Sequence, residues 1–269
     1  MIHWGRRRFG MLKLMLGVVM LSCFLAAHMV RAEPQVIAFG ATTVTLEHFY
    51  DPKTGNYYEP ITTDFPGRPR PAMATNSKIT PLCAVVDSGV MSSHPIIKQS
   101  LKESIDFTGE GPEDLAGHGT MIALLYLQNL PAGFPIVSVK VLDRRGKGRL
   151  KDLIKGIKWA ANKGARIINV SAGVYLTCTT VREEGAGDAE STDSCERTPI
   201  CQAVTALKDA ALVIAAVGND PGRIACPACC RDSLAVGAMA GDKIAPYTGM
   251  YPDVLAPGTV YFRVVKRSD

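Results

Sequence analysis

The chain has 269 residues and a hydrophobic fraction of 47%, so it can bury the core of one large α/β domain, which we expect, or of two small ones. Its formal net charge of +5 is spread along the sequence, and the densest basic cluster, Arg6–Arg8, falls in a segment expected to be removed. This charge pattern gives no indication of a nucleic-acid partner.

The first residues predict export from the cytoplasm. Arg6–Arg8 are basic, residues 14–27 are almost entirely apolar, and Val30–Ala32 resembles a small-residue cleavage site. We expect a signal peptide over residues 1–32, by a general or a twin-arginine route, and a periplasmic or extracellular mature chain. The apolar run is shorter than the roughly 20 residues of a membrane-spanning helix. Membrane contact is therefore expected only through the signal during export, with an uncleaved anchor as the alternative.

The composition changes near residue 82. Residues 33–81 are rich in Pro, Gly, Thr and Tyr without a sustained helical period, and we expect an irregular N-terminal arm. Beyond it, apolar β-branched runs alternate with helical stretches, which is typical of βαβ units around a parallel sheet. The predicted strands are Leu82–Val86, Ile136–Val141, Ile167–Val170, Leu212–Val217 and Ser233–Val236. The predicted fold class is α/β.

Two helices and one insertion are expected between these strands. Leu150–Lys163 has apolar residues at near-helical spacing among lysines, which predicts an amphipathic crossover helix. A second helix is expected over Ile200–Ala210. Between them, Thr177–Pro199 is rich in Gly, Asp, Glu and Ser, and we expect a surface insertion that a disulfide could close.

Cysteines are frequent in the second half of the chain. Eight cysteines minus Cys23, which lies in the signal, leave seven, at positions 83, 178, 195, 201, 226, 229 and 230. In an oxidising compartment several would pair, and the odd number leaves at least one outside these pairs. Cys226-Pro-Ala-Cys229 has the spacing of half a zinc site, but no matching Cys or His pair accompanies it. Disulfides are therefore favoured over a metal.

Three polar residues stand at the ends of predicted elements. Asp87 follows an apolar strand, where catalytic groups collect in open α/β folds, although an Asp there often only caps a turn. His118 lies between two glycines ahead of the apolar run Met121–Leu127, which suits the start of a buried helix. Asn219 ends another strand and is either a turn residue or a donor to a developing oxyanion. Taken together, Asp87 and His118 favour catalysis over capping.

The chain also carries a series of short motifs. They are Cys83–Val90, Ser93–Pro95, Gly117–Thr120, Val137–Asp143 with Gly146 and Gly148, Ile167–Gly173, Ala215–Asn219 and Asp253–Gly258. In this order they resemble the landmarks of subtilisin-like serine proteases, the subtilase family, in which Asp also precedes His along the chain. The resemblance covers residues 82–258. It implies a three-layer fold with a central, mainly parallel sheet, of which this chain lacks the C-terminal part.

The resemblance implies a role for individual residues. Asp87 orients the base, His118 acts as general base and then as acid, and Asn219 donates to the oxyanion. The backbone strip for an extended substrate is Ser171, Ala172 and Gly173, and the wall of the specificity pocket includes Ala215, Ala216, Val217 and Gly218. Binding through main-chain hydrogen bonds favours extended polypeptide as the partner. The implied reaction is peptide-bond hydrolysis through an acyl-enzyme, without cofactor or metal.

The sequence departs from the family pattern after Gly258. The family expects a Gly-Thr-Ser-Met-Ala-like segment with the nucleophile at the start of a buried helix, and residues 259–269, an atypical basic tail, contain none. Ser268 has no glycine before it and is not expected to be the nucleophile. Met121–Leu124 also replaces the small residues that usually follow the histidine. We therefore expect the chain as given to be inactive.

Three interpretations stay open. The first is a serine endopeptidase whose reading frame is truncated or shifted. The second is a non-catalytic pseudoprotease that keeps the groove and binds polypeptide; against it, Asp87, His118 and Asn219 all remain in motif context. The third, an α/β fold of unrelated function, requires the motifs to coincide in order by chance.

Overall fold

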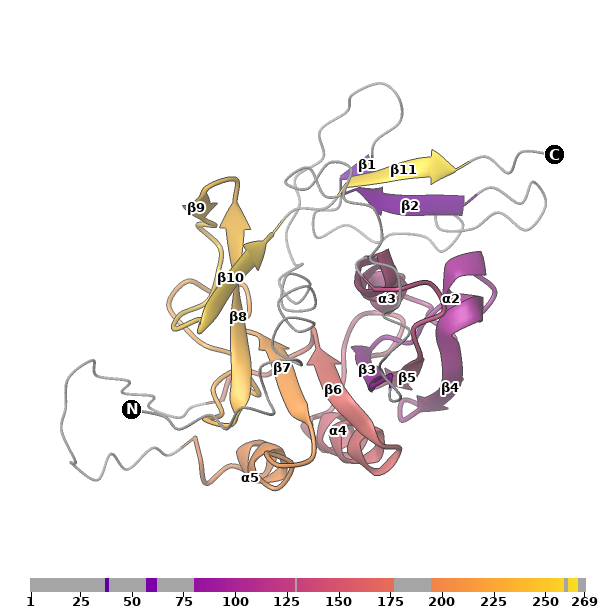
Figure 1. Ribbon diagram of the computed structural model, residues 1–269. Helices are drawn as coiled ribbons and strands as arrows, with labels where there is room; N and C mark the ends of the chain where they lie inside the picture. Colours follow the sequence, from indigo (N-terminus) through magenta and orange to yellow (C-terminus); the bar gives the residue numbers. More distant parts are fainter. Residues whose placement is uncertain are drawn as a thin grey trace.

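The computed structural model describes residues 80–128, 130–176 and 195–258, together with three strands outside them. Its centre is a sheet of eight strands in the order β10-β8-β7-β6-β3-β5-β4, with β9 paired to β8 (Figure 1). The strands are β3 (Leu82–Asp87), β4 (Leu101–Asp106), β5 (Ile136–Lys140), β6 (Ala165–Val170), β7 (Leu212–Ala216), β8 (Ser233–Ala240), β9 (Lys243–Ile244) and β10 (Val254–Pro257). Neighbours along this order are parallel, and β9 is antiparallel to β8. The predicted α/β class with a mainly parallel sheet is confirmed.

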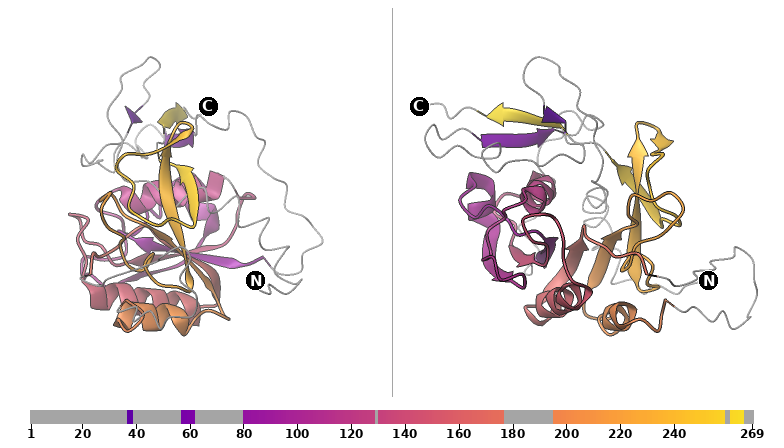
Figure 2. Two further views of the ribbon diagram at one scale, coloured as in Figure 1. Left: turned by 90° about the vertical axis from the view of Figure 1, so that its left-hand side faces the viewer. Right: turned by 180° about the vertical axis from the view of Figure 1, so that it is seen from behind.

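Helices cover both faces of the sheet and make three layers (Figure 2). They are α2 (Pro95–Ser100), α3 (His118–Gln128), α4 (Leu150–Asn162) and α5 (Pro199–Thr205). Because side chains alternate along a strand, Cys83 and Val85 of β3 join one buried cluster, with α2 and α3, whereas Ala84 and Val86 join the other, with α4 and α5. The central strand thus holds the two halves of the core together.

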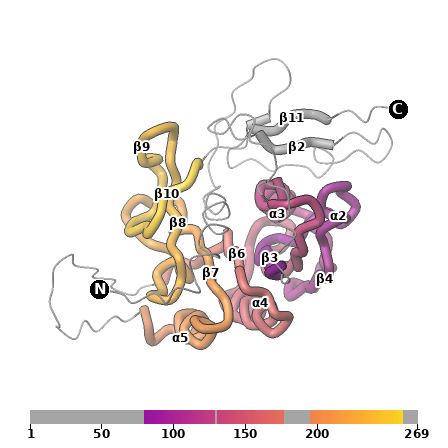
Figure 3. The backbone as a smooth tube through the Cα atoms, viewed as in Figure 1, coloured from indigo at the N-terminus to yellow at the C-terminus, as the bar shows by residue number. Residues whose placement is uncertain are grey.

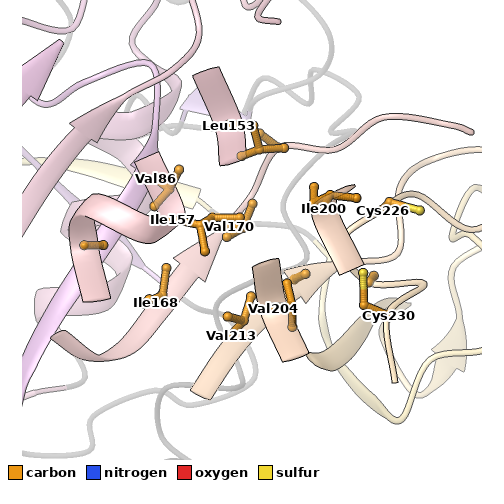
Figure 4. Close-up of a cluster of buried hydrophobic side chains, with 14 of the residues drawn as sticks. Val86, Leu153, Ile157, Ile168, Val170, Ile200, Val204, Val213, Cys226 and Cys230 are labelled. Carbon is orange, nitrogen blue, oxygen red and sulfur yellow. The ribbon is translucent and has the colours of Figure 1, made fainter. Parts of the chain in front are cut away.

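Helices α3 and α4 differ in how they are covered. Helix α3 is buried from Gly119 to Leu127, as expected for a helix that is apolar on every side. Helix α4 buries one face, including Leu153 and Ile157, and turns its lysines to solvent, as its sequence pattern predicts. Figure 4 shows these two side chains in one cluster with Val170 of β6 and with Ile200 and Val204 of α5.

Most predicted elements lie where the sequence places them, and the differences have physical causes. Each predicted strand lies within one or two residues of an observed one, except that β8 continues to Ala240. Strand β4 was not predicted, because Leu101–Asp106 carries charges and lies at the edge of the sheet, where partial exposure is tolerated. Helix α5 ends at Thr205, not at Ala210, and residues 206–210 form turns in place of the last predicted part of the helix.

A small second sheet joins segments from near the two ends of the chain. Strand β11 (Tyr261–Val265) lies between β1 (Ile37–Ala38) and β2 (Tyr57–Ile61), antiparallel to both. The sequence predicted no strand in either the N-terminal arm or the basic tail. The predicted signal, the remainder of that arm, the insertion 177–194 with its Cys178, and Ser268 lie outside the described residues. Within the described part of the chain, no helix has the length and apolar character needed to cross a membrane.

The order of the strands creates a switch point beside β3. After β3 the chain forms β4 and β5 on one side, and then crosses to β6 on the other side and continues outward to β7 and β8 (Figure 3). Ligand sites in open parallel sheets form at such points, outside the carboxyl ends of the strands. Asp87 is the last residue of β3 and therefore stands at this position.

Candidate active site

Asp87 and His118 are brought together at the carboxyl edge of the sheet. Oδ1 of Asp87 lies 2.7 Å from Nδ1 of His118 and accepts a hydrogen bond of 2.7 Å from the backbone N–H of Ser88. The Asp87 side chain is fully buried, whereas 20% of the His118 side chain is exposed. A buried carboxylate on Nδ1 fixes the ring and its tautomer, and leaves Nε2 as the nitrogen for proton transfer.

The glycine after the histidine allows helix α3 to start against strand β3. A Cβ atom at Gly119 would lie 2.1 Å from the carbonyl oxygen of Gly89 and 3.1 Å from Cβ of Asp87. Any larger residue would therefore push the helix away from the strand end. This close approach of the two backbones places His118 beside Asp87.

The loop that leads into α3 is anchored by a buried lysine. Lys140, at the end of β5, is fully buried, donates a hydrogen bond of 2.9 Å to the carbonyl of Glu113 and lies 3.7 Å from Oε2 of Glu110. Desolvation raises the pKa of Glu110, but hydrogen bonds from Arg144 and the charges of Arg144 and Lys140 outweigh it and lower the pKa. The loop thus presents carbonyl and carboxylate oxygens to Lys140 while its chain continues to His118.

The predicted substrate strip follows β6, next to β3. Ser171 and Ala172 are buried, and Gly173 is exposed. The Ser171 hydroxyl accepts a hydrogen bond of 3.0 Å from Asn169. Beyond Gly173, Val174 exchanges two backbone hydrogen bonds with Cys226. The strip therefore ends in a single antiparallel bridge between Val174 and Cys226.

The predicted pocket wall follows β7, on the other side of β6. Ala215, Ala216 and Val217 are buried, and Asn219 is exposed. Because β7 pairs with β6 and β6 pairs with β3, Asn219 lies two strands away from Asp87 along the sheet edge. The structure brings Asp87 and His118 into contact and does not bring Asn219 to Asp87.

Tyr175, which the sequence did not single out, bridges the strip and the wall. Its hydroxyl accepts a hydrogen bond of 2.9 Å from the backbone N–H of Asn219, and Arg223 stacks 4.5 Å from its ring centre. A Cβ atom at Gly218 would lie 2.3 Å from the same hydroxyl. No local spacing marks this tyrosine, because its partners lie more than 40 residues away along the chain, 44 in the case of Asn219.

A cavity opens on the other side of the strip. Its volume is about 330 Å³, and it is lined by Ala172–Val174, by Val141 and Leu142 after β5, by the loop Gly146–Leu150 and by Leu153 of α4. The predicted strip is therefore flanked by a cavity on one side and by the Tyr175 contact on the other.

The cysteine-rich segment forms the floor behind Gly173 and Gly218. The sulfur atoms of Cys201 and Cys230 lie 2.13 Å apart and those of Cys226 and Cys229 lie 1.94 Å apart. Ala225, beside them, would contact a Cβ atom placed at Gly173 or Gly218. Cys195 and Cys201 also lie near Cys226-Pro-Ala-Cys229, within three-sulfur groups less than 4.8 Å across.

These features describe an α/β protein with a buried Asp87 and a partly exposed His118 in contact at the sheet edge, and with a backbone strip after β6 that is exposed at Gly173. A model of the subtilase family matches residues 79–267. Since this match spans more than half of the sequence, the chain belongs to the subtilase family.

Individual relatives agree with this assignment. The thermophilic serine proteinase of Bacillus sp. (strain AK1) is 30% identical over 190 residues, which cover 65% of this chain and 43% of that protein. Subtilisin E of Bacillus subtilis (strain 168) is 30% identical over 192 residues, covering 65% of this chain and 46% of its own length. The chain thus spans less than half the length of these two relatives.

Solved structures show the same fold. A lanthipeptide protease superposes with a TM-score of 0.53 at 23% identity, covering 66% of this chain and 55% of that one. A cold adapted subtilisin-like serine proteinase gives a TM-score of 0.52 at 20% identity, covering 69% of this chain and 68% of that one.

Proposed function

We propose that this chain supplies the Asp–His half of a serine endopeptidase site together with the groove that holds an extended polypeptide. Asp87 orients His118, which takes the proton of a serine hydroxyl and then gives it to the leaving amine. Asn219 donates to the oxyanion. The observation that carries the proposal is the 2.7 Å contact between the fully buried Asp87 and the partly exposed His118.

The substrate side of the proposal rests on the strip Ser171–Gly173. Exposed backbone at Gly173 can pair with an extended chain, and the absence of a side chain lets that chain approach closely. The adjoining cavity of about 330 Å³ can take a side chain of the bound polypeptide. The names of the relatives, a serine proteinase and a subtilisin, support a protein substrate for this chain as well.

We expect the chain as given to lack activity until a serine is supplied. An Asp–His pair without its nucleophile leaves only residual catalysis, because the members of a triad act as a unit. The alternative is a pseudoprotease that binds polypeptide and hydrolyses nothing. The two differ in what happens when the serine is added.

The deciding experiment joins to the chain the nucleophile-bearing C-terminal segment of a relative such as subtilisin E. We call this product the serine-completed chain. It is expected to hydrolyse an unfolded protein, and His118→Ala is expected to reduce kcat by a factor on the order of 10⁴ or more. Binding of the unfolded protein without hydrolysis would support the pseudoprotease. Inhibitor-sensitive proteolysis by the unmodified chain would instead reveal a nucleophile within it, Ser268 included.

We also propose export and disulfide formation, with residues 1–32 as a cleaved signal, 33–81 as an arm, 82–258 as the peptidase domain and 259–269 as a tail. One relative is named a cell wall-associated protease, of Bacillus subtilis (strain 168), 37% identical over 105 residues, covering 34% of this chain and 12% of that protein. N-terminal sequencing of exported protein should begin near Glu33.

Thiol counting tests the redox part. Burial raises the pKa of Cys83 to about 12, so this thiol reacts only after unfolding. Fewer than the seven cysteines beyond the signal should react in denatured, non-reduced protein. Reaction of all seven would refute the disulfides.

A further inference from the structure

A second buried carboxylate, which the proposed mechanism does not use, lies in the loop just before His118. Asp114 is 1% exposed and accepts five hydrogen bonds. Its Oδ1 accepts from the Ser88 hydroxyl at 2.9 Å and from the backbone N–H groups of Ala116 and Gly117 at 3.0 and 2.8 Å. Its Oδ2 accepts from the backbone N–H and the hydroxyl of Thr120 at 2.8 and 2.6 Å. We call these residues the Asp114 network.

The network ties the strand end that carries Asp87 to the helix turn that carries His118. The Ser88 hydroxyl donates to Asp114 and accepts from the backbone N–H of Gly119 at 2.9 Å. The Thr120 hydroxyl donates to Asp114 and accepts from the backbone N–H of Met91 at 3.0 Å. Every partner thus lies within two residues of His118 or within four residues of Asp87.

The chemistry of this site calls for a carboxylate. The first N–H groups of a helix have no partner within the helix, and a negative charge is favoured there. Both oxygens of Asp114 are surrounded by donors. An asparagine would offer one acceptor oxygen, and its NH₂ group would face the N–H of Thr120 or the donors at the other oxygen.

We propose that Asp114 is a positioning residue that sets the geometry of the Asp87–His118 hydrogen bond. Its role in catalysis rests on the proposed function, whereas its role in geometry does not. A displacement of the helix turn of about 1 Å at such a site costs roughly 100-fold in rate.

The test compares Asp114→Asn with Asp106→Asn. Asp106 is a matched control, because its carboxylate also accepts several hydrogen bonds in a turn, from Thr108, Gly109 and Gly111, but none involves the pair. The readout on the unmodified chain is the low-field N–H proton resonance of the His118–Asp87 hydrogen bond, recorded by NMR between about pH 5 and 8.

We expect Asp114→Asn to lose this resonance and Asp106→Asn to keep it. In the serine-completed chain, Asp114→Asn should lower kcat about 100-fold with little change in KM. An unchanged resonance in folded Asp114→Asn would overturn the proposal and leave Asp114 a purely structural residue. If Asp114→Asn does not fold, Ser88→Ala serves instead, because it removes the hydroxyl that donates to Asp114 and accepts from the N–H of Gly119. An unchanged resonance in Ser88→Ala would then overturn the proposal. If Asp114→Asn loses the resonance but the serine-completed chain hydrolyses nothing, the proposed function is refuted and the positioning role of Asp114 stands.

Discussion

Two regions support the candidate site, and they are built from opposite chemistry. The Asp114 network holds the Asp87–His118 side through directional hydrogen bonds to one buried carboxylate. The region of the predicted substrate strip, which we call the groove side, packs near a cysteine cluster. We define this cluster as Cys201, Cys226, Cys229 and Cys230, and their sulfur atoms lie at bonding distance in two pairs. Figure 4 shows Cys226 and Cys230 among apolar side chains of the α4–α5 face.

The difference shows which region sets the orientation of side chains and which region contributes to the stability of the fold. Hydrogen bonds to a carboxylate weaken steeply with distance and angle, so the network controls orientation. Disulfides act mainly by restricting the unfolded chain, so the disulfides proposed for the cluster would contribute to the free energy of unfolding. Changes to the network should therefore affect the pair, and changes to the cluster should affect stability and the groove floor.

Removal of the Cys201–Cys230 pair should have the largest effect on stability. Both members of a pair must be replaced, because Sγ of Cys229 lies 3.8 Å from that of Cys201 and 4.0 Å from that of Cys230 and could pair anew. The sequence separations of 29 and 3 predict losses of about 3.5 kcal/mol for Cys201→Ser/Cys230→Ser and about 1.5 kcal/mol for Cys226→Ser/Cys229→Ser. Denaturant unfolding measures both, and equal losses would argue against the disulfides.

The contact between helix α3 and strand β3 gives the second prediction. Gly119→Ala should cost about 3 kcal/mol and displace His118, because its Cβ atom would lie 2.1 Å from the Gly89 carbonyl. Gly222→Ala is the control, since its Cβ atom would meet only Asp220 at 3.7 Å. Thermal unfolding and the low-field His118 resonance measure the outcome. An unaffected resonance would mean that the helix start is not held by this contact.

The sequence predicted the features that depend on local patterns of residues, and it did not predict those that depend on contacts between distant residues. Apolar runs predicted the strands of the core, and motif context singled out Asp87 and His118. Tyr175 was not singled out, because its partner Asn219 lies 44 residues away along the chain. Asp114 was not singled out, because its link to the strand end depends on Ser88, 26 residues away. An Asp four residues before the histidine resembles a helix-capping pattern, and this was the available signal for Asp114.

Tyr175→Phe tests whether the groove side also depends on a directional bond. Loss of the hydroxyl leaves the Asn219 N–H without its 2.9 Å partner and should cost about 1 kcal/mol. Tyr251→Phe is the control, because that side chain is exposed and makes no hydroxyl bond within the described residues. Denaturant unfolding compares the two. A cost equal to that of the control would show that Tyr175 only packs against Gly218.

The smallest effect is expected at the exposed counterpart of the Asp114 network. Partial burial raises the pKa of Asp106, but hydrogen bonds from Thr108, Gly111 and Gly109 outweigh it and lower the pKa below 3.8. A carboxylate whose pKa is lowered on folding stabilises the protein above the pKa of the unfolded chain. This stabilisation disappears as the pH falls through the folded pKa.

Asp106→Asn should therefore be slightly less stable than the parent chain at neutral pH, and the difference should shrink as the pH falls from about 5 towards about 2. The effect stays small because water screens a partly exposed carboxylate. Denaturant unfolding at several pH values measures the difference. A gap that widens in acid would mean that the protonated side chain makes the hydrogen bonds in the turn. In that case Asp106 and Asp114 would have in common the number of hydrogen-bond donors around the carboxyl group, and not a need for negative charge. The different effects expected of Asp114→Asn and Asp106→Asn would then have to be explained by burial alone.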